Sequence, residues 1–469
     1  MSSIFVAKVT KSFLSKTPIK GIISIFIFFN LKDNMANKKI CEHPKWSYST
    51  NVYEVNVRQY TQEGTYVAFA KNLPRLKDMG VQVLWFMPIT PISDKDRLGT
   101  LGSYYAAKNY DASNVEFGTM DEFKDLIKEA HEMGFKIIID FVADHTGNDH
   151  PWVTENPHFY VQGENNDILH PHGWTDVSQL NYNVPQVWKY MVNVLKFWVE
   201  DCNVDGFRCD MAHLVPLNFW IYAKRKMSKV KEGLFWLGEC EEPEYHRVFD
   251  ATYTWRWMHA TDDFYHGKMN LQSLLTVLYK SVTEFPCNSF RLYFTSNHDE
   301  NSWNGTEYEK YGDAAQLFAV FSCTWNGIPL IYSGQEMPNK KRLKFFDKDH
   351  VEWTDKFELH DFYKTLLTLR SNNKCLRAGD PNVLTQIISH PDDHRVFSYL
   401  KKYRSNQVLV ILNCSNEGLN FEVKNVKGVF RNVFGGDDIS FEKSNQVYLN
   451  PWGYLVFERV PMLTYKLKS

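Results

Sequence analysis

Residues 120–145 read MDEFKDLIKEAHEMGFKIIIDFVADH, a helical pattern followed at once by a buried strand. Met120–Met133 places apolar side chains at helical spacing, carries acids early and stops at Gly134, as helices commonly do. Phe135–Val142 is almost continuously apolar and β-branched, which is typical of a parallel strand covered on both faces. This stretch therefore predicts one helix–strand repeat of an α/β fold.

The same alternation recurs between residues 50 and 333. Further helical segments are expected at Phe69–Met79, Val187–Trp198 and Ala314–Thr324. Eight strands at this spacing predict a (β/α)8 TIM barrel, and an open doubly wound sheet is the alternative. No G-x-G-x-x-G follows an early strand, which disfavours the dinucleotide-binding version of that alternative. The eight expected strands are Asn51–Val57, Val81–Pro88, Phe135–Val142, Val204–Asp210, Leu234–Glu239, Val248–Tyr253, Ser289–Thr295 and Pro329–Ser333.

Two regions depart from the alternation. His145 to about Asn183 is rich in Asn, Asp, His, Pro and Gly, and a loop of that length predicts a functional, loop-rich insert after the third strand. After Arg377 short alternating strands predict a C-terminal antiparallel β sandwich. We expect these strands at Val396–Lys401, Gln407–Asn413, Gly428–Val433 and Val447–Phe457. The expected parts are an N-terminal extension (1–45), the barrel (46–377) with its insert (145–183), and the sandwich (378–469).

The N-terminal residues carry a mixed signal. Lysines precede the apolar run Gly21–Leu31, as in a signal peptide, but no A-x-A-like cleavage site follows. The run is too short to span a bilayer as a helix. A start at Met35, with residues 1–34 as an upstream extension, explains the pattern equally well. We expect a cytoplasmic protein, with export as the alternative if residues 1–34 are a genuine signal.

Composition excludes several function classes. Lys and Arg total 53 and Asp and Glu total 55, a formal net charge of −2, so the chain lacks the basic footprint of nucleic-acid binding. The 8 cysteines form no C-x-x-C pair, which disfavours zinc, and they are too sparse for a disulfide scaffold. We therefore expect mostly buried thiols. Aromatic residues make up 15% of the chain, enough to supply stacking surfaces for sugar rings or bases as well as the core.

Polar side chains stand where several of the expected strands end. The carboxyl ends of all strands in a parallel barrel point to one face, so these groups should converge there. Any one of them could simply cap the next helix, but four clusters at four strand ends predict a functional site. The groups are Asp140 with Asp144 and His145, Arg208 with Asp210, Glu239, and Asn297 with His298 and Asp299.

Paired carboxyl groups are what glycoside hydrolysis requires. Arg208 lies two residues before Asp210 on one strand, so both side chains share a face, and the cation favours an ionised Asp210 as nucleophile. Glu239 has no basic neighbour in the sequence, and nearby acids would raise its pKa, which suits a general acid. Asp299 remains to stabilise positive charge. Metal-assisted hydrolysis through His145 and His298 is the alternative, which the arginine beside Asp210 disfavours.

The chain resembles the α-amylase family of glycoside hydrolases (family 13) over most of residues 50–460. Five stretches in family order carry the resemblance. They are Asp140–His145 (DFVADH, family D-x-x-x-N-H), Gly206–Asp210 (GFRCD, family G-F-R-x-D), Gly238-Glu239, Phe294–Asp299 (FTSNHD, family F-x-x-N-H-D) and Gly327–Glu336 (GIPLIYSGQE, family G-x-P-L-I-Y-x-G-Q-E).

The resemblance implies a retaining double displacement at α-1,4-glucosidic bonds of starch, maltodextrins or related α-glucans. It makes Asp210 the nucleophile, Glu239 the acid/base and Asp299 the transition-state stabiliser. It further implies that Arg208 orients Asp210, that His145 and His298 hydrogen-bond the sugar, and that Tyr105 stacks beneath it. Tyr104 is the near alternative to Tyr105.

The resemblance leaves other points open. It requires no cofactor for the chemistry, but Asp144 replaces an asparagine that often binds a structural calcium ion, and it could ligate one too. A glucanotransferase or isomerase with the same covalent intermediate is one alternative, and a catalytically silent glucan-binding or partner subunit is another. The expected partner is an α-glucan substrate, without nucleic acid or stable membrane insertion, and the oligomeric state is undetermined.

Overall fold

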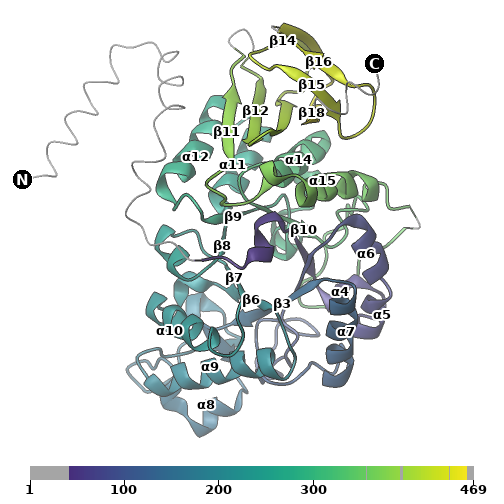
Figure 1. Cartoon of the computed structure of the whole chain (residues 1–469). Coiled ribbons are helices and arrows are strands. Elements are labelled where there is room, and N and C mark those ends of the chain that lie inside the picture. Colours follow the sequence, from purple (N-terminus) through teal and green to yellow (C-terminus); the bar gives the residue numbers. More distant parts are fainter. Residues whose placement is uncertain (1–41, 355, 391–393, 443, 462–469) are drawn as a thin grey trace, which may run out of the picture.

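The computed structural model describes residues 42–354, 356–390, 394–442 and 444–461. Its parallel strands close into a barrel with the spatial order β1-β10-β9-β8-β7-β6-β3-β2 (Figure 1). The predicted (β/α)8 barrel is therefore confirmed: a barrel strand lies within seven of the eight expected ranges, and β10 begins one residue before the eighth. The strands are β1 (Val52–Val55), β2 (Val83–Phe86), β3 (Lys136–Val142), β6 (Gly206–Asp210), β7 (Phe235–Gly238), β8 (Ala251–Tyr253), β9 (Phe290–Tyr293) and β10 (Ile328–Tyr332). The expectations for residues 1–34 lie outside the described residues and stay predictions.

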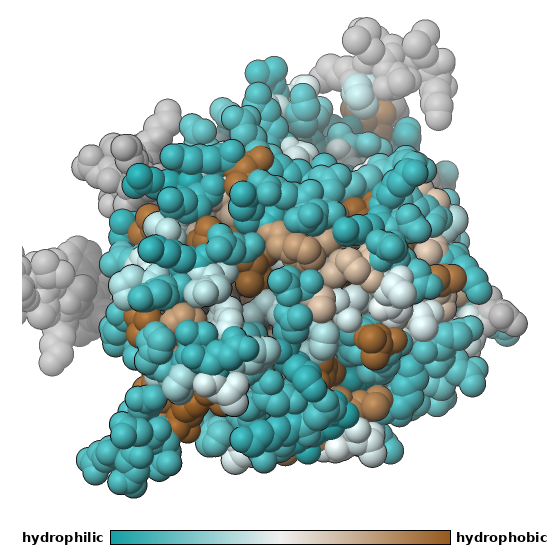
Figure 2. Space-filling model, turned by 90° about the horizontal axis from the view of Figure 1, so that it is seen from below, coloured by the Kyte–Doolittle hydropathy of each residue, from teal (hydrophilic) through white to brown (hydrophobic). Residues whose placement is uncertain are grey.

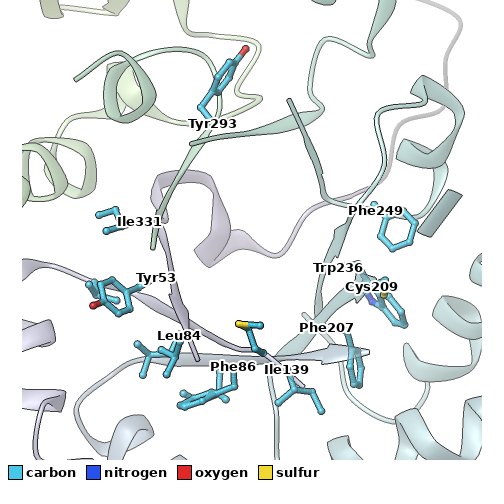
Figure 3. Packing of buried hydrophobic residues seen from close by; sticks show 14 of the residues in the cluster. Tyr53, Leu84, Phe86, Ile139, Phe207, Cys209, Trp236, Phe249, Tyr293 and Ile331 are labelled. Atoms are coloured by element: carbon cyan, nitrogen blue, oxygen red, sulfur yellow. The ribbon is translucent and has the colours of Figure 1, made fainter. Parts of the chain in front are cut away.

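Side-chain alternation divides the barrel into two separate apolar layers. One set of side chains fills the barrel interior, including Val83, Ile138 and Leu237. The alternate set, including Phe207 and Trp236, packs outward against the helices, as Figure 3 shows. Full burial of one such side chain stabilises the fold by about 1.5–3 kcal/mol. Both layers are needed because a parallel strand in a barrel has no solvent-facing side.

Helices surround the barrel and connect its strands (Figure 1). Helix α7 begins with a capping box, in which Thr119 and Glu122 bond each other's backbone N–H groups. The single helix expected over Phe69–Met79 is wrong: the chain forms α5 and α6, because Asn72 starts a new helix with Pro74 in its first turn. The α-helices are α4 (Val57–Tyr60), α5 (Tyr66–Ala70), α6 (Leu73–Met79), α7 (Met120–Glu132), α8 (Pro151–Glu155), α9 (Pro185–Glu200), α10 (Leu217–Met227), α11 (Trp255–Tyr265), α12 (Leu271–Glu284), α13 (Glu307–Tyr311), α14 (Ala315–Thr324) and α15 (His360–Asn372).

The insert after β3 has more regular structure than its composition predicts. Strand β4 (His145–Gly147) pairs antiparallel with β5 (Val177–Gln179), which places His145 opposite Gln179. The short helix α8 lies between the two strands. The Tyr110 hydroxyl donates to the His145 carbonyl at 2.7 Å and ties the start of the insert to the barrel.

The C-terminal region consists of two antiparallel sheets, ordered β11-β12-β13-β18-β15-β16 and β14-β17. They share one apolar cluster, as expected of a sandwich. The single strand expected at Val447–Phe457 is wrong, because β17 and β18 belong to different sheets and the chain turns between them at Asn450–Gly453. The strands are β11 (Leu384–Ile388), β12 (Val396–Tyr403), β13 (Asn406–Asn413), β14 (Leu419–Lys424), β15 (Gly428–Asn432), β16 (Ile439–Phe441), β17 (Ser444–Leu449) and β18 (Tyr454–Arg459).

In the described part of the chain, no helix combines the length and the apolar character needed to cross a bilayer. The face seen in Figure 2 is mostly hydrophilic, and its hydrophobic residues form small separate spots. Scattered apolar residues of this kind are normal on a folded domain.

Candidate active site

Arg208 lies at the centre of the site, fully buried at the carboxyl end of β6. Its Nη1 lies 2.7 Å from Asp210 Oδ1 and 3.1 Å from Asp140 Oδ1, and its Nη2 lies 2.7 Å from Glu239 Oε2. Its Nε donates to the Tyr253 hydroxyl at 3.2 Å. One guanidinium therefore donates hydrogen bonds to Asp140 and Asp210 and forms a close ion pair with Glu239.

Strand pairing explains why these residues meet. Strands β3 and β6 pair so that Asp140 lies beside Arg208, and β6 and β7 pair so that Cys209 lies beside Gly238. The next residue, Glu239, donates its backbone N–H to the Cys209 carbonyl at 3.0 Å. The predicted convergence of polar groups at strand ends is therefore what the barrel produces. Cys209 itself packs in the outer apolar layer, as strand alternation predicts (Figure 3).

Glu239 has a cationic neighbour that lies far from it in the sequence, and its pKa is nevertheless raised, as expected for a general acid. Glu239 has no basic neighbour in the sequence, but Arg208, from a different strand, lies 2.7 Å from its Oε2. Burial nevertheless raises the pKa of Glu239, Arg208 lowers it in part, and the Asp210 carboxylate adds to the rise. The net direction favours a protonated carboxyl group, which is what a general acid needs.

A strained residue connects the two carboxylates. Met211 follows Asp210 directly and adopts a left-handed backbone, with φ 38° and ψ 45°, which is costly for a side chain of its size. The turn aims the Met211 N–H at Glu239 Oε2, at 2.9 Å. The end of β6 thereby fixes the side chain that extends from the end of β7.

Asp140 anchors the other side of the cluster. Its carboxylate accepts hydrogen bonds from Arg208, from Trp85 Nε1 at 3.2 Å and from the Tyr105 hydroxyl at 3.3 Å. Burial raises the pKa of Asp140 to about 7, against the lowering effect of Arg208 and with a further contribution from Asp210. Asp140 thus fixes the positions of Arg208 and Tyr105 together.

His298 is held between two acids. Its Nδ1 lies 2.5 Å from Glu54 Oε1, and its Nε2 lies 3.2 Å from Asp299 Oδ2. Burial lowers the pKa of His298, but Asp299 and Glu54 outweigh burial and raise it to about 9. The ring is therefore protonated at neutral pH. Sequence reasoning missed Glu54, although an acid inside the apolar strand β1 signals a buried partner.

Tyr105, not Tyr104, faces the site. The Tyr105 ring stacks on His298, with centroids 5.6 Å apart and planes at 22°, and its hydroxyl lies 2.7 Å from His298 Nε2. Tyr104 is buried beneath the Arg58 guanidinium instead, 4.2 Å from its ring centroid. The structure thus places a half-buried aromatic face at the mouth of the barrel.

The three acids differ in exposure. The Asp299 side chain is 37% exposed, whereas those of Asp210 and Glu239 are 9% and 8% exposed. Asp299 is thus the most accessible of the three acids to a bound molecule, whereas the other two contact Arg208. His145 enters from the insert and packs edge-on against Trp174, with ring centroids 5.7 Å apart.

Asp144, the residue expected to ligate a calcium ion, is buried just after the end of β3, beside His145. Asp144 Oδ2 lies 3.5 Å from His145 Nδ1. Within the described ranges, no three His, Cys, Asp or Glu side chains gather around a common metal position. Calcium dependence stays a prediction, and thermal unfolding with EDTA or added calcium tests it.

Comparisons with known proteins agree with this geometry. Residues 43–167 and 168–358 match the family model of the alpha amylase catalytic domain. Alpha-amylase 2 of Dictyoglomus thermophilum is 24% identical over 438 residues, which cover 84% of this chain and 74% of that protein. Alpha-amylase MalA of Haloarcula japonica is also 24% identical, over 82% of this chain and 58% of that protein.

Solved structures give the same result. A maltogenic alpha-amylase from Thermotoga neapolitana has a TM-score of 0.80 at 27% identity, over 88% of this chain and 99% of that one. An alpha-amylase from Lactobacillus plantarum has a TM-score of 0.80 at 26% identity, over 88% and 100%. With the family model covering most of the barrel and the carboxylates gathered at its mouth, the chain belongs to the α-amylase family of glycoside hydrolases.

Proposed function

We propose that this protein is a retaining α-glycosidase that hydrolyses α-1,4-glucosidic bonds in starch, maltodextrins or related α-glucans. The observation that carries the proposal is the pair of contacts from one Arg208 guanidinium, to Asp210 through Nη1 and to Glu239 through Nη2. Because both contact the same guanidinium, the carboxyl groups of Asp210 and Glu239 lie close together. A retaining pair needs such closeness, with about 5–5.5 Å between the carboxyl groups.

In the first step Glu239 gives its proton to the glycosidic oxygen. Asp210 attacks the anomeric carbon, and the bond from that carbon to the leaving oxygen breaks as the covalent ester forms. Arg208 holds Asp210 Oδ1, which leaves Oδ2 as the attacking atom. The elevated pKa of Glu239 keeps the proton available until this step.

In the second step Glu239, now ionised, takes a proton from water. The water oxygen attacks the anomeric carbon, Asp210 leaves, and two inversions give net retention. Asp299 and the Tyr105 face contact the sugar as positive charge develops on its ring. Protonated His298 directs one ring N–H to Glu54 and the other to the Tyr105 hydroxyl and Asp299, and so holds these two groups beside the sugar.

Time-resolved proton NMR of the protein with maltoheptaose tests the proposal. New reducing ends should appear first as the α anomer and mutarotate afterwards. The Asp210→Asn variant should leave the spectrum unchanged. First-formed β anomers, or full activity in that variant, would exclude the mechanism.

A transferase is the second candidate, because the covalent intermediate is the same. One relative, an alpha-1,4-glucan:maltose-1-phosphate maltosyltransferase of Picrophilus torridus, is 23% identical over 81% of this chain. The same NMR experiment separates the two reactions, since transfer redistributes chain lengths without new reducing ends. Saccharide binding without any turnover would instead indicate a binding or partner subunit.

A further inference from the structure

A second, buried acid follows Asp299 directly in the chain. Glu300 begins η6 (Glu300–Asn304), a single π-helical turn, which is a rare element that often occurs at functional sites. The Asp299 side chain is 37% exposed, whereas the Glu300 side chain is only 4% exposed. The two neighbouring carboxylates therefore have different surroundings, one accessible to a bound molecule and the other inside the protein.

Lys310, in α13, forms an ion pair with Glu300. Its Nζ lies 2.6 Å from Glu300 Oε2, and its side chain is buried as well. The same Nζ donates to Met258 Sδ at 2.9 Å. In the part of the chain that the structure describes, Glu300 takes part in no other ion pair. A buried, charge-assisted hydrogen bond is stronger than one in water, so Lys310 fixes where the Glu300 side chain lies.

The rest of the π-helical turn is bonded to the same residue. Asn304 Nδ2 donates to Glu300 Oε1 at 2.9 Å, and the Gly305 N–H donates to the Glu300 carbonyl at 2.9 Å. The Glu300 N–H donates to Asn297 Oδ1 at 2.8 Å, across His298 and Asp299. Because the segments before and after Glu300 are both bonded to it, the position of Glu300 sets the direction of the Asp299 side chain.

Helix α13 is itself fixed to the chain that leads out of β9. Thr306 and Glu309 form a capping box at its first turn. The Thr295 hydroxyl, two residues after β9, donates to Glu307 Oε1 at 2.5 Å. Lys310 therefore extends from a support that is in place before substrate binds, and such preorganisation lowers the cost of reaching the reactive geometry.

On the basis of the proposed function, we propose that Lys310 is a positioning residue for Asp299 and acts on it through Glu300. Lys310 is buried and acts without contact with the sugar. It holds the π-helical turn in the arrangement that directs the Asp299 carboxylate to the sugar as positive charge develops. A displacement of about 1 Å can reduce the rate about 100-fold, so the ion pair should affect the transition state more than substrate binding.

Steady-state kinetics with maltoheptaose, followed by reducing-end release, test the proposal. Lys310→Met replaces the lysine by an apolar side chain of similar length and leaves Glu300 without its cation. We expect kcat to fall about 10- to 100-fold while KM changes less than about threefold. A raised KM with the parent's kcat would overturn the positioning role.

A second variant separates position from stability. A buried carboxylate without its cation destabilises the fold, so Lys310→Met by itself could fold poorly. Glu300→Gln/Lys310→Met removes both charges and should return the free energy of unfolding in urea close to the parent's value. Its kcat should nevertheless stay at least about tenfold below that of the parent. Recovery of kcat together with stability would show that the pair serves stability alone.

The sandwich offers a matched control. Lys401→Met makes the same replacement at a buried lysine of β12, whose Nζ donates to Asn326 Oδ1 at 2.5 Å. This variant should keep the parent's kcat and KM. An equal fall in kcat would mean that loss of any buried lysine impairs the enzyme, and would overturn the assignment to Lys310.

Crystal structures provide a readout that does not depend on turnover. In Glu300→Gln/Lys310→Met the Asp299 carboxylate should be displaced from its place in the parent, whereas in Lys401→Met it should not. A displaced Asp299, in a protein whose parent leaves maltoheptaose intact, would keep the positioning role and exclude the proposed function. An undisplaced Asp299 together with turnover by the parent would overturn the positioning role and keep the function.

Discussion

The mouth of the barrel and the core of the C-terminal sandwich are both buried, yet they consist of opposite kinds of side chain. At the mouth, Arg208 donates hydrogen bonds to Asp140 and Asp210 and forms an ion pair with Glu239, and Glu54 faces His298. Between the two C-terminal sheets, aliphatic and phenylalanine side chains form one cluster. Buried charges cost desolvation energy that apolar packing does not, so the mouth is arranged for chemistry and the sandwich for stability.

Among variants in these two regions, Asp210→Asn is expected to have the largest effect, and the effect should fall on activity rather than on stability. The change is nearly isosteric and keeps a polar partner for Arg208, so the melting temperature should change little. Loss of the nucleophile should reduce kcat by about 10⁴-fold or more. Activity within tenfold of the parent, measured by reducing-end release, would show that the barrel mouth serves another purpose.

Arg208→Leu should damage both activity and stability. It leaves the carboxylates of Asp140, Asp210 and Glu239 buried without their cation, and breaking buried pairs in this way costs about 3–5 kcal/mol. Urea unfolding measures this change. Leu409→Ala, in the sandwich, is the control and should cost a similar amount, about 2–5 kcal/mol, through a cavity alone. The control should retain the parent's kcat at low temperature.

Glu54→Gln should alter the pH dependence more than the maximal rate. The parent's His298 has a pKa raised to about 9, so its charge, and the stability that the charge contributes, is fully present below about pH 6.5 and is lost as pH rises through about 9. Without the Glu54 carboxylate that pKa falls. The alkaline limb of kcat/KM and the alkaline loss of stability should both move to lower pH. Identical pH profiles of kcat/KM and of stability in parent and variant would show that Glu54 does not keep His298 charged.

The smallest effect is expected where the sandwich meets the barrel. The Tyr399 hydroxyl lies 2.6 Å from Thr324 Oγ1 in a buried pair between β12 and α14. Tyr399→Phe should lower the free energy of unfolding by about 1–2 kcal/mol and leave kcat unchanged. A large fall in kcat for this variant would mean that the two regions are coupled more tightly than their separate chemistry indicates.

Sequence reasoning located the strands more accurately than the helix and turn boundaries. Runs such as Phe135–Val142 need no partner to be recognised, because a strand buried on both faces must be apolar. Boundaries at Asn72 and at Asn450–Gly453 were missed, since local turn chemistry overrides the apolar pattern there. The polar strand ends Arg208, Asp210 and Glu239 were predicted together because one rule, the common direction of barrel strands, places them.

The sequence by itself determined the barrel, the sandwich and the residues that gather at the barrel mouth, because periodicity and strand-end chemistry are local properties. Only the tertiary structure decided which side chains touch. Arg208 forms an ion pair with Glu239, Glu54 contacts His298 although the two lie 244 positions apart in the sequence, and the Trp303 ring packs against Phe345. These contacts join different strands and loops, and their geometry depends on barrel closure and register, which no single segment encodes.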